Sequence, residues 1–286
     1  MDFSSFIIQV LNGFNLILIL ILVALGLAII FGLMQVINMA HGEFFLLGAY
    51  TVVMTQWVGL SFWMGLMFST IVVGLIGLMV EFFCIRYIYE RPMDTILATW
   101  GISIGIKQFI ILVYGPGGQM VTHPLPAMVR FFGIEYPAYR LFTMVASIIV
   151  ILFTFYVFLR TDYGLKARAV IANRNMASAL GINTRKMYQT SFVFGSALAG
   201  LAGGIMSPLM SVDPQMGLGY LIPAFLAIII GGMGTLYGVL GGGTIIGGAD
   251  SVFSYLISPV GAQIIVFSMA IVLIRLRPWG IFGRQP

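Results

Sequence analysis

Long apolar runs, separated by short polar segments, organise nearly the whole chain. A helix needs about 20 predominantly apolar residues to cross a bilayer. Runs of roughly this length predict spans at residues 6–33, 42–59, 62–86, 93–114, 140–160, 189–210, 218–238, 240–258 and 262–275. The pattern indicates an all-α polytopic membrane protein with about eight or nine transmembrane helices, forming a single domain over residues 1–286.

The composition strengthens this interpretation. Of the 286 residues, 60% are hydrophobic and only 8% are charged, whereas soluble domains carry about 25% charged residues. So few charges cannot cover the surface of a water-soluble protein of this length. A single cysteine, Cys84, excludes an internal disulfide and a CxxC site.

The placement of Lys and Arg predicts the orientation, because cytoplasmic loops retain an excess of both. If residues 161–188 are cytoplasmic, only Arg130 and Arg140 lie outside, and Lys107 lies within a span. The basic residues on the inner side are then Arg86, Arg91, Arg160, Lys166, Arg168, Arg174, Arg185, Lys186, Arg275, Arg277 and Arg284. We expect a cytoplasmic C-terminus and, with nine spans, an external N-terminus.

Two connections are long enough to have a role of their own. The external connection, residues 115–139, is rich in Gly and Pro and cannot form a simple helix. It is either a plain connector along the membrane interface or a docking site for an external partner. In the cytoplasmic connection, residues 161–188, helix-forming Ala, Leu, Lys and Arg lie between Gly164 and Gly181 and predict one or two short helices.

An internal echo suggests two related halves. Residues 27–49 can be laid over residues 226–248 without a gap, and Leu, Ala, two Ile, Met and three Gly recur. Related halves with interrupted helices are common in membrane transporters. In the second half, four glycines predict a broken or re-entrant segment, because each costs roughly 1 kcal/mol in a helix interior. They are Gly231, Gly232, Gly234 and Gly238.

Polar residues interrupt the apolar pattern after the first run. Gln35, Asn38, His41 and Glu43 follow one another closely within an otherwise hydrophobic stretch. Such groups are costly at bilayer depth unless they face protein or water. They either line a polar pathway beside a helix break or lie at the membrane surface where two spans join.

Three further charges lie within apolar runs. We expect Glu81 to pair locally near Arg86 or to reach the inner surface. Lys107 and Asp250 lie deeper, so a mutual ion pair or a water-filled cavity is expected for them.

Several enzyme classes lack their residues in this chain. The sequence contains no GxxxxGK[ST] motif for ATP phosphates. His41 and His123 are far apart and belong to no metal-ligand motif, so no metal site is expected. Ser196 with His41 is the pair that an intramembrane hydrolase would need, although the small residues around Ser196 also suit close helix packing.

Four ordered blocks resemble the permease subunits of ABC importers for branched-chain amino acids and for urea or short-chain amides. The blocks are GLAIIFGLMQVINMAHGEFFLLGAY, RTDYGLKARAVIANRNMASALGI, GGMGTLYGVLGG and RPWGIFG. Within that family, three segments look most like the urea-transporter branch, with branched-chain amino acids as the alternative substrate. These segments are ERPMDTILATWGIS, YRLF and ANRNMASALGI.

The resemblance implies a subunit without catalytic residues or a cofactor of its own, located in a bacterial inner membrane. Its implied partners are a second, homologous permease, two cytoplasmic ATPase subunits that bind ATP and Mg²⁺, and a periplasmic solute-binding protein. The chain would form half of a translocation path, for which Gln35, Asn38, His41 and Glu43 are candidates. The residues that match the family's ATPase-coupling region are Gly164, Arg168, Ala169, Asn173, Ala177, Gly181 and Ile182. A passive channel for small neutral solutes is the alternative from another class, but a channel has no need of the basic segment 161–188.

Overall fold

The computed structural model describes residues 3–89, 91–131, 133–277 and 279–283. Helices dominate this part of the chain, and the remaining regular structure is one two-stranded sheet. The α-helices are α1 (Phe3–Met34), α2 (His41–Trp57), α3 (Phe62–Phe83), α4 (Pro92–Tyr114), α5 (Ala138–Arg160), α6 (Asp162–Ala172), α7 (Arg174–Ala179), α8 (Thr184–Met206), α9 (Met216–Gly231), α10 (Leu236–Leu256) and α11 (Pro259–Leu276). The shorter elements are the 3-10 turns η1 (Ile85–Tyr87) and η2 (Ser207–Leu209) and the strands β1 (Met128–Phe131) and β2 (Ile134–Pro137).

The apolar runs of the sequence fold as helices, which confirms the all-α membrane architecture, although the run at 218–238 is interrupted between α9 and α10. Among the described residues, 6 helical segments are long and apolar enough to cross a bilayer: α1, α3 with η1, α4, α5, α8 with η2, and α11. With 17 and 16 residues, α2 and α9 are shorter than a full crossing. The glycines and Asp250 lower the hydropathy of α10.

The core forms around α1 and α8. α8 packs against α1, α2 and α3, and α10 packs against α1, α9 and α11. At the α1–α8 crossing, a Cβ added to Gly26 would lie 2.6 Å from the Gly195 carbonyl oxygen. The small residues around Ser196 therefore bring two helices into close backbone contact, as is common in membrane bundles.

The connection at residues 115–139 contains a β-hairpin, which its Gly and Pro content did not indicate. β1 and β2 pair antiparallel, with Arg130 opposite Glu135. The Tyr136 hydroxyl donates to Asn12 Oδ1 at 3.0 Å, and Arg140 also donates to Asn12. The hairpin is therefore attached to the beginning of α1.

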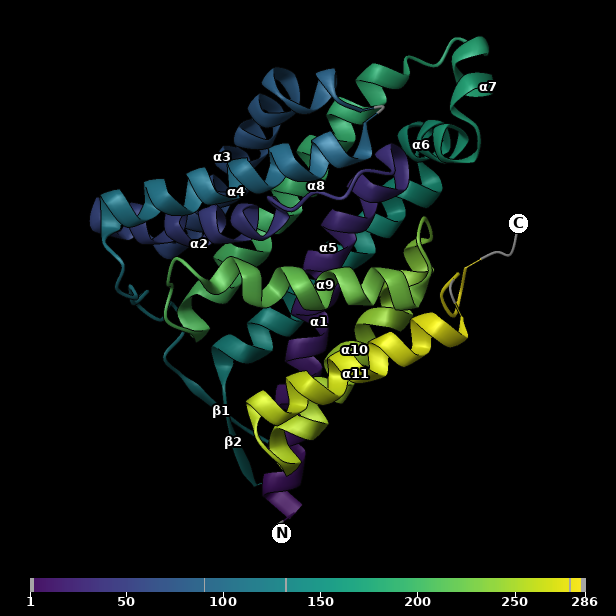
Figure 1. Cartoon of the computed structure of the whole chain (residues 1–286). Coiled ribbons are helices and arrows are strands. Elements are labelled where there is room, and N and C mark those ends of the chain that lie inside the picture. The colour runs from purple at the N-terminus through teal and green to yellow at the C-terminus, as the bar shows by residue number, and fades with distance from the viewer. Residues whose placement is uncertain (1–2, 90, 132, 278, 284–286) are drawn as a thin grey trace.

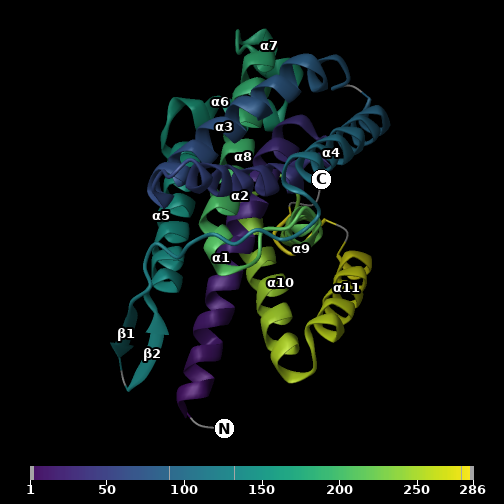
Figure 2. The ribbon, with the colours of Figure 1, turned by 90° about the vertical axis from the view of Figure 1, so that its left-hand side faces the viewer.

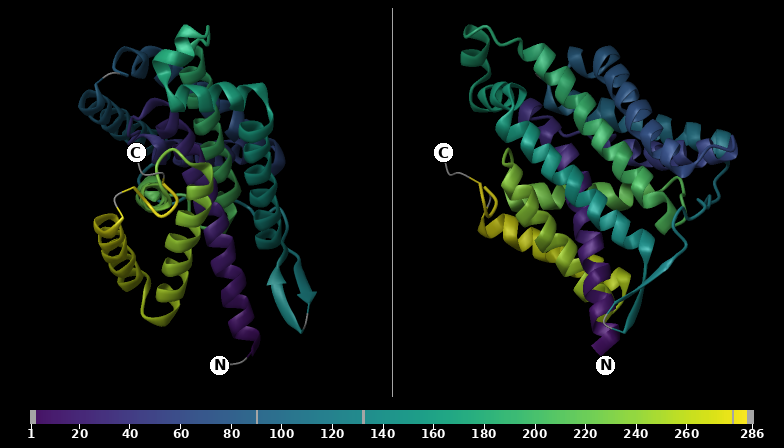
Figure 3. Two further views of the ribbon diagram at one scale, coloured as in Figure 1. Left: turned by 90° about the vertical axis from the view of Figure 1, so that its right-hand side faces the viewer. Right: turned by 180° about the vertical axis from the view of Figure 1, so that it is seen from behind.

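The two ends of the molecule carry different structural elements (Figure 1 and Figure 2). α6 and α7 project at one end, and the N-terminus and the hairpin lie at the opposite end (Figure 1 and Figure 2). Gln119 and Val212 form an isolated β-bridge, which joins the segment before the hairpin to the connection between α8 and α9. The view from behind shows that α5 leads to the end that carries α6 and α7, and that α8 leads back from it (Figure 3). Arg284, one of the residues expected on the cytoplasmic side, lies outside the described residues.

The echoed segments both fold as helix, break and helix. α1 and α2 flank the first break, and α9 and α10 flank the second. In the ungapped alignment Gln35 corresponds to Gly234, and both have a left-handed backbone, with φ of 54° and 83°. Gln35 is the one non-glycine residue with positive φ in the described chain. This shared break position supports an internal repeat.

Candidate functional site

The break between α1 and α2 brings Asn38 into the protein interior. Asn38 is fully buried, and its Oδ1 accepts a hydrogen bond from the Ala40 amide at 3.0 Å. Its Nδ2 has no hydrogen-bond partner in the part of the chain that the structure describes. Gln35, at the start of the break, is exposed and does not join this group.

His41 opens α2 and reaches back to the middle of α1. Its Nε2 lies 3.1 Å from the Val23 carbonyl oxygen, and its ring meets Phe44 edge-on. Gly26, one turn after Val23, leaves room for the imidazole, since a Cβ there would lie 3.1 Å from His41 Cε1. Nδ1 is buried without a partner among the described residues. The histidine thus anchors the break to α1.

Glu43 extends the polar group toward α4. Its Oε1 accepts from Ser103 Oγ at 2.9 Å, and Lys107, one turn further along α4, interacts with the carboxylate electrostatically. Of the two alternatives expected for Lys107 and Asp250, the mutual ion pair is wrong, because no ion pair joins them among the described residues and α4 packs beside α2. We call Asn38, His41 and Glu43 the break cluster. It is a buried polar group in which three side-chain atoms have no hydrogen-bond partner among the described residues.

The second break lies between α9 and α10. α9 ends at Gly231, and Gly232 and Gly234 have positive φ values of 108° and 83°. Gly238 does not break a helix; it lies in the first turn of α10, where its amide donates to the capping hydroxyl of Thr235. It is small for another reason, because a Cβ there would lie 2.5 Å from the Gly231 carbonyl oxygen.

The C-terminal tail closes this second break. The Ile281 and Phe282 amides donate to the carbonyl oxygens of Ile230 and Gly231 at 2.7 and 3.1 Å. These carbonyls belong to the last turn of α9, which has no helical donors for them. Residues of the RPWGIFG block therefore cap the end of α9, a structural role that the sequence analysis did not predict.

The segment 161–188 folds as two short helices, each with a side-chain cap. Thr161 accepts from the Gly164 amide at the start of α6, and Asn173 accepts from the Met176 amide at the start of α7. Gly181 has a φ of 83° and turns the chain toward α8. Short polar side chains at helix starts and glycine just past a helix end are the usual signals.

The residues that match the family's coupling region divide into buried and exposed sets. Gly164 and Ala177 are buried and hold the two helices to their surroundings, whereas Arg168, Asn173 and Gly181 are exposed. Ala169 and Ile182 are half-buried. The outer surface adds three apolar side chains that the sequence analysis did not single out: Leu165, Met176 and Leu180, exposed by 61%, 59% and 75%. We call these three residues and Arg168 the α6–α7 surface.

A cavity of about 710 Å³ lies between α6, the last turns of α1 and the second break. Arg168 and Ile171 of α6 line it together with Gly32 near the end of α1 and Gly234 in the second break. Gly32 lies close to the second break and to α6, since a Cβ at Gly32 would lie 3.7 Å from Gly234 Cα and 3.7 Å from Ile171 Cδ1. α6 therefore borders both the end of α1, just before the first break, and the second break.

The hydrolase pair does not come together. Ser196 is buried, and its hydroxyl donates to the Phe192 carbonyl oxygen of its own helix at 2.8 Å. The His41 imidazole is held by Val23 instead. No hydrogen bond joins the two side chains in the described structure, so this arrangement lacks the contact that an activated nucleophile needs.

Glu81 lies in a polar cluster that the sequence did not reveal. It is fully buried in α3, and its carboxylate accepts from the Tyr89 hydroxyl and from Gln189 Nε2 of α8, the latter at 3.0 Å. Burial and the neighbouring Glu81 raise the pKa of Tyr89, so the phenol remains a donor. Arg86, the expected partner, lies over the Phe82 ring at 4.2 Å. The sequence signal for this polar cluster was the position of Glu81, a carboxylate within an apolar run.

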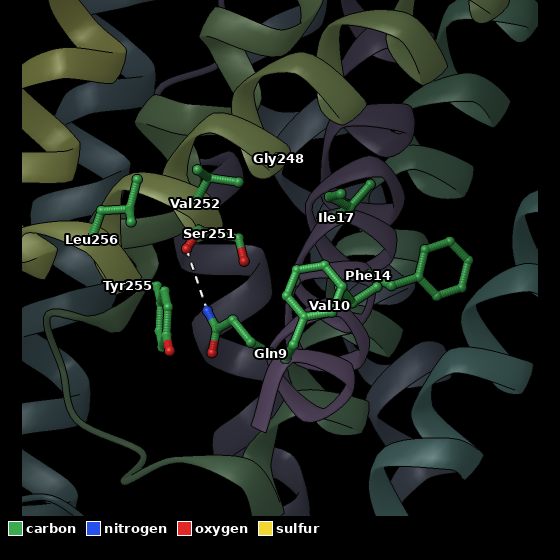
Figure 4. Close-up of a pocket in the computed structure, with 11 residues that line it drawn as sticks. Gln9, Val10, Phe14, Ile17, Gly248, Ser251, Val252, Tyr255 and Leu256 are labelled. Carbon is green, nitrogen blue, oxygen red and sulfur yellow. Dashed lines mark hydrogen bonds between the residues drawn. The ribbon is translucent and has the colours of Figure 1, made fainter. Parts of the chain in front are cut away.

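A groove of about 450 Å³ lies between α1 and α10 (Figure 4). Its walls are apolar side chains such as Phe14, Ile17 and Leu256, and one hydrogen bond crosses it, from Gln9 Nε2 to the Ser251 carbonyl oxygen at 3.4 Å. Such walls offer little to a polar solute.

Comparison with known proteins places this architecture in a family. Residues 9–275 match the family model described as branched-chain amino acid transport system / permease component. No solved structure gives a significant match.

Three curated relatives agree with the family model. The high-affinity branched-chain amino acid transport system permease protein LivH of Escherichia coli (strain K12) is 27% identical, over 99% of this chain and 97% of that protein. The probable branched-chain amino acid transport permease protein LivH of Methanocaldococcus jannaschii is 28% identical, over 92% and 88%. The permease protein LivM of the same Escherichia coli transport system is 24% identical, over 79% of this chain and 59% of LivM.

All these names refer to branched-chain amino acids, so the comparisons favour that alternative over the urea-transporter branch. The family is one of transport subunits and not of enzymes. Because the match covers nearly the whole chain, the protein belongs to the family of permease components of branched-chain amino acid transport systems.

Proposed function

We propose that this chain is a permease subunit of an ABC importer that carries branched-chain amino acids across a bacterial inner membrane. The observation that carries the proposal is the family match over residues 9–275. The relatives named for this substrate class cover almost the full chain, which supports the same substrate here.

The chain forms half of the translocation path and pairs with a second permease. Support comes from LivH and LivM, two permease proteins of one Escherichia coli system that both resemble this chain. Two cytoplasmic ATPase subunits supply ATP and Mg²⁺ binding, and a solute-binding protein delivers the substrate from outside.

The α6–α7 surface docks on the ATPase. Its exposed Leu165, Met176 and Leu180 suit an apolar groove, and Arg168 adds charge at the rim. A short amphipathic helix that lays its apolar face into a groove is a common recognition mode. Closure of the ATPase pair would move α6, and the close approach of Ile171 and Gly234 to Gly32 would pass that movement to the end of α1 and to the second break.

The break cluster lies in the first break and at the start of α2, directly after the end of α1. Asn38, His41 and Glu43 keep buried atoms without partners in the described chain. Unpaired buried polar groups are costly, and rearrangement of the break would allow them to contact water or solute. We therefore assign these residues to the path, next to Gln35 at the start of the break.

The test is ATP-dependent uptake by proteoliposomes that contain the complete importer. We expect labelled leucine to accumulate only with ATP inside and with the solute-binding protein outside, and urea not to accumulate. Accumulation of urea without leucine would overturn the substrate. Leucine flux through the purified chain alone, without the ATPase, would instead identify a passive channel.

A further inference from the structure

A second cavity, of about 230 Å³, lies where α1, α9, α10 and α11 meet. Each helix contributes one face: Leu16 and Leu20 from α1, Met216 and Tyr220 from α9, Asp250 from α10, and Gln263 and Phe267 from α11. Drug-sized ligands occupy pockets of roughly 300–1,000 Å³. A cavity just below that range suits a ligand the size of one amino acid.

The cavity combines apolar walls with one carboxylate. Asp250 has no hydrogen bond or ion pair in the described part of the chain, although it is half-buried in a membrane helix. A lone charge at such a site calls for a partner. Lys107 does not supply one, because it interacts with Glu43.

Two neutral polar groups lie in the same cavity. Gln263 of α11 can donate through its side-chain amide. The Tyr220 hydroxyl donates to Met210 Sδ at 3.7 Å and interacts electrostatically with Asp250. A carboxylate, an amide and a phenol on apolar walls match the ammonium, the carboxylate and the aliphatic side chain of a zwitterionic amino acid.

The cavity also lies toward the end of the molecule that the distribution of Lys and Arg predicts to be external. Tyr220 is in the first turns of α9, which follow the connection bridged to Gln119 beside the hairpin. Gln263 is in the first turns of α11, just after the end of α10. These helix ends lie away from α6 and α7 (Figure 1).

We infer that this cavity binds the branched-chain amino acid during transport, with Asp250 receiving the ammonium group, Gln263 and Tyr220 facing the carboxylate, and Leu20, Met216 and Phe267 enclosing the side chain. The inference rests on the proposed function and assigns its substrate a place in the chain. The break cluster, in contrast, serves the moving part of the path.

Two independent variants test the site. Asp250→Asn removes the charge, and we expect leucine uptake by the complete importer to fall about tenfold or more, the usual effect of losing one charge-assisted hydrogen bond. Gly219→Leu fills the cavity, and the backbone tolerates it because a Cβ at Gly219 meets nothing within 4 Å. We expect this variant to lose leucine uptake more severely than valine uptake.

The matched controls lie on α4. Asp94→Asn changes an exposed carboxylate, and Gly101→Leu adds a side chain where a Cβ likewise meets nothing within 4 Å. Both should transport like the native importer. Asp250→Glu, which keeps the charge, should retain more uptake than Asp250→Asn. ATP hydrolysis stimulated by the loaded solute-binding protein should persist in every variant, since docking and coupling are untouched.

The outcomes separate the two proposals. If the native importer carries leucine and both cavity variants carry it equally well, the site is wrong and the proposed function stands. If the native importer carries no branched-chain amino acid, the proposed function fails and the inference fails with it.

Discussion

Individual residues explain how helices with few charges remain specifically packed. Glu81 links α3 to α8 and to the segment before α4 through Gln189 and Tyr89. A buried carboxylate with two donors stabilises its neighbours, whereas its removal leaves both donors without their acceptor.

We predict that Glu81→Ala destabilises the protein by about 1–3 kcal/mol for this reason. The thermal midpoint of the detergent-solubilised protein should fall by roughly 2–4 °C per kcal/mol. Glu81→Gln keeps an acceptor oxygen for Tyr89 and should lose less. Equal midpoints for the native protein and Glu81→Ala would contradict the role of this carboxylate.

Close backbone contact depends on single glycines. A Cβ added to Gly48 of α2 would lie 2.0 Å from the Gly200 carbonyl oxygen of α8. We predict that Gly48→Val forces these helices apart and costs at least the roughly 1–3 kcal/mol typical of overpacking. The yield of folded protein in a size-exclusion profile measures the effect. Gly105→Val on α4, where a Cβ meets no atom within 4 Å, is the control and should behave like the native protein.

At the scale of elements, α6 and α7 are distinct from the membrane helices. They are short, capped by Thr161 and Asn173, and expose apolar and basic side chains together. Ala177 is only 2% exposed, so an acid there would disrupt α7 itself. The exposed positions are the informative ones for coupling.

If the α6–α7 surface docks on the ATPase as proposed, each of Arg168→Glu and Leu180→Glu removes one contact of that interface. We therefore predict that both leave membrane insertion unchanged but reduce ATP-driven leucine uptake about tenfold or more. Uptake and the amount of inserted protein are measured on the same proteoliposomes. Met93→Glu is the control, since Met93 is 74% exposed and an acid is favourable in the first turn of α4. Normal uptake by both α6–α7 variants would remove this segment from the coupling path.

At the scale of the whole molecule, the contacts define two sides. The bridge from Gln119 to Val212 and the hydrogen bond from Tyr136 to Asn12 bring three distant segments to the side of the N-terminus. α6 and α7 lie at the other end (Figure 1). Together with the distribution of Lys and Arg, this arrangement favours an external N-terminus and a cytoplasmic C-terminus.

Labelling with a membrane-impermeant maleimide tests this orientation. In a Cys84→Ser background, Met120→Cys should react in spheroplasts, and Leu180→Cys should react only in inverted vesicles. Both native side chains are exposed, by 83% and 75%, so access depends on the side of the membrane. The reverse pattern would invert the topology and place the α6–α7 surface outside.

The sequence by itself determined that the protein lies in a membrane, where its helices occur and which fold class it has. Apolar runs and the Lys and Arg residues beside them act through local composition, so these features need no tertiary contact. It also located both breaks, since glycine and polar residues weaken a helix where they stand. Only the tertiary structure decided which helix each charged residue, glycine or hairpin residue contacts. Lys107 interacts electrostatically with Glu43 and forms no ion pair with Asp250 among the described residues. Gly238 of α10 packs against Gly231 of α9, and the hairpin that contains Arg130 is hydrogen-bonded to α1. These outcomes depend on contacts between segments far apart in the chain, which no local pattern records.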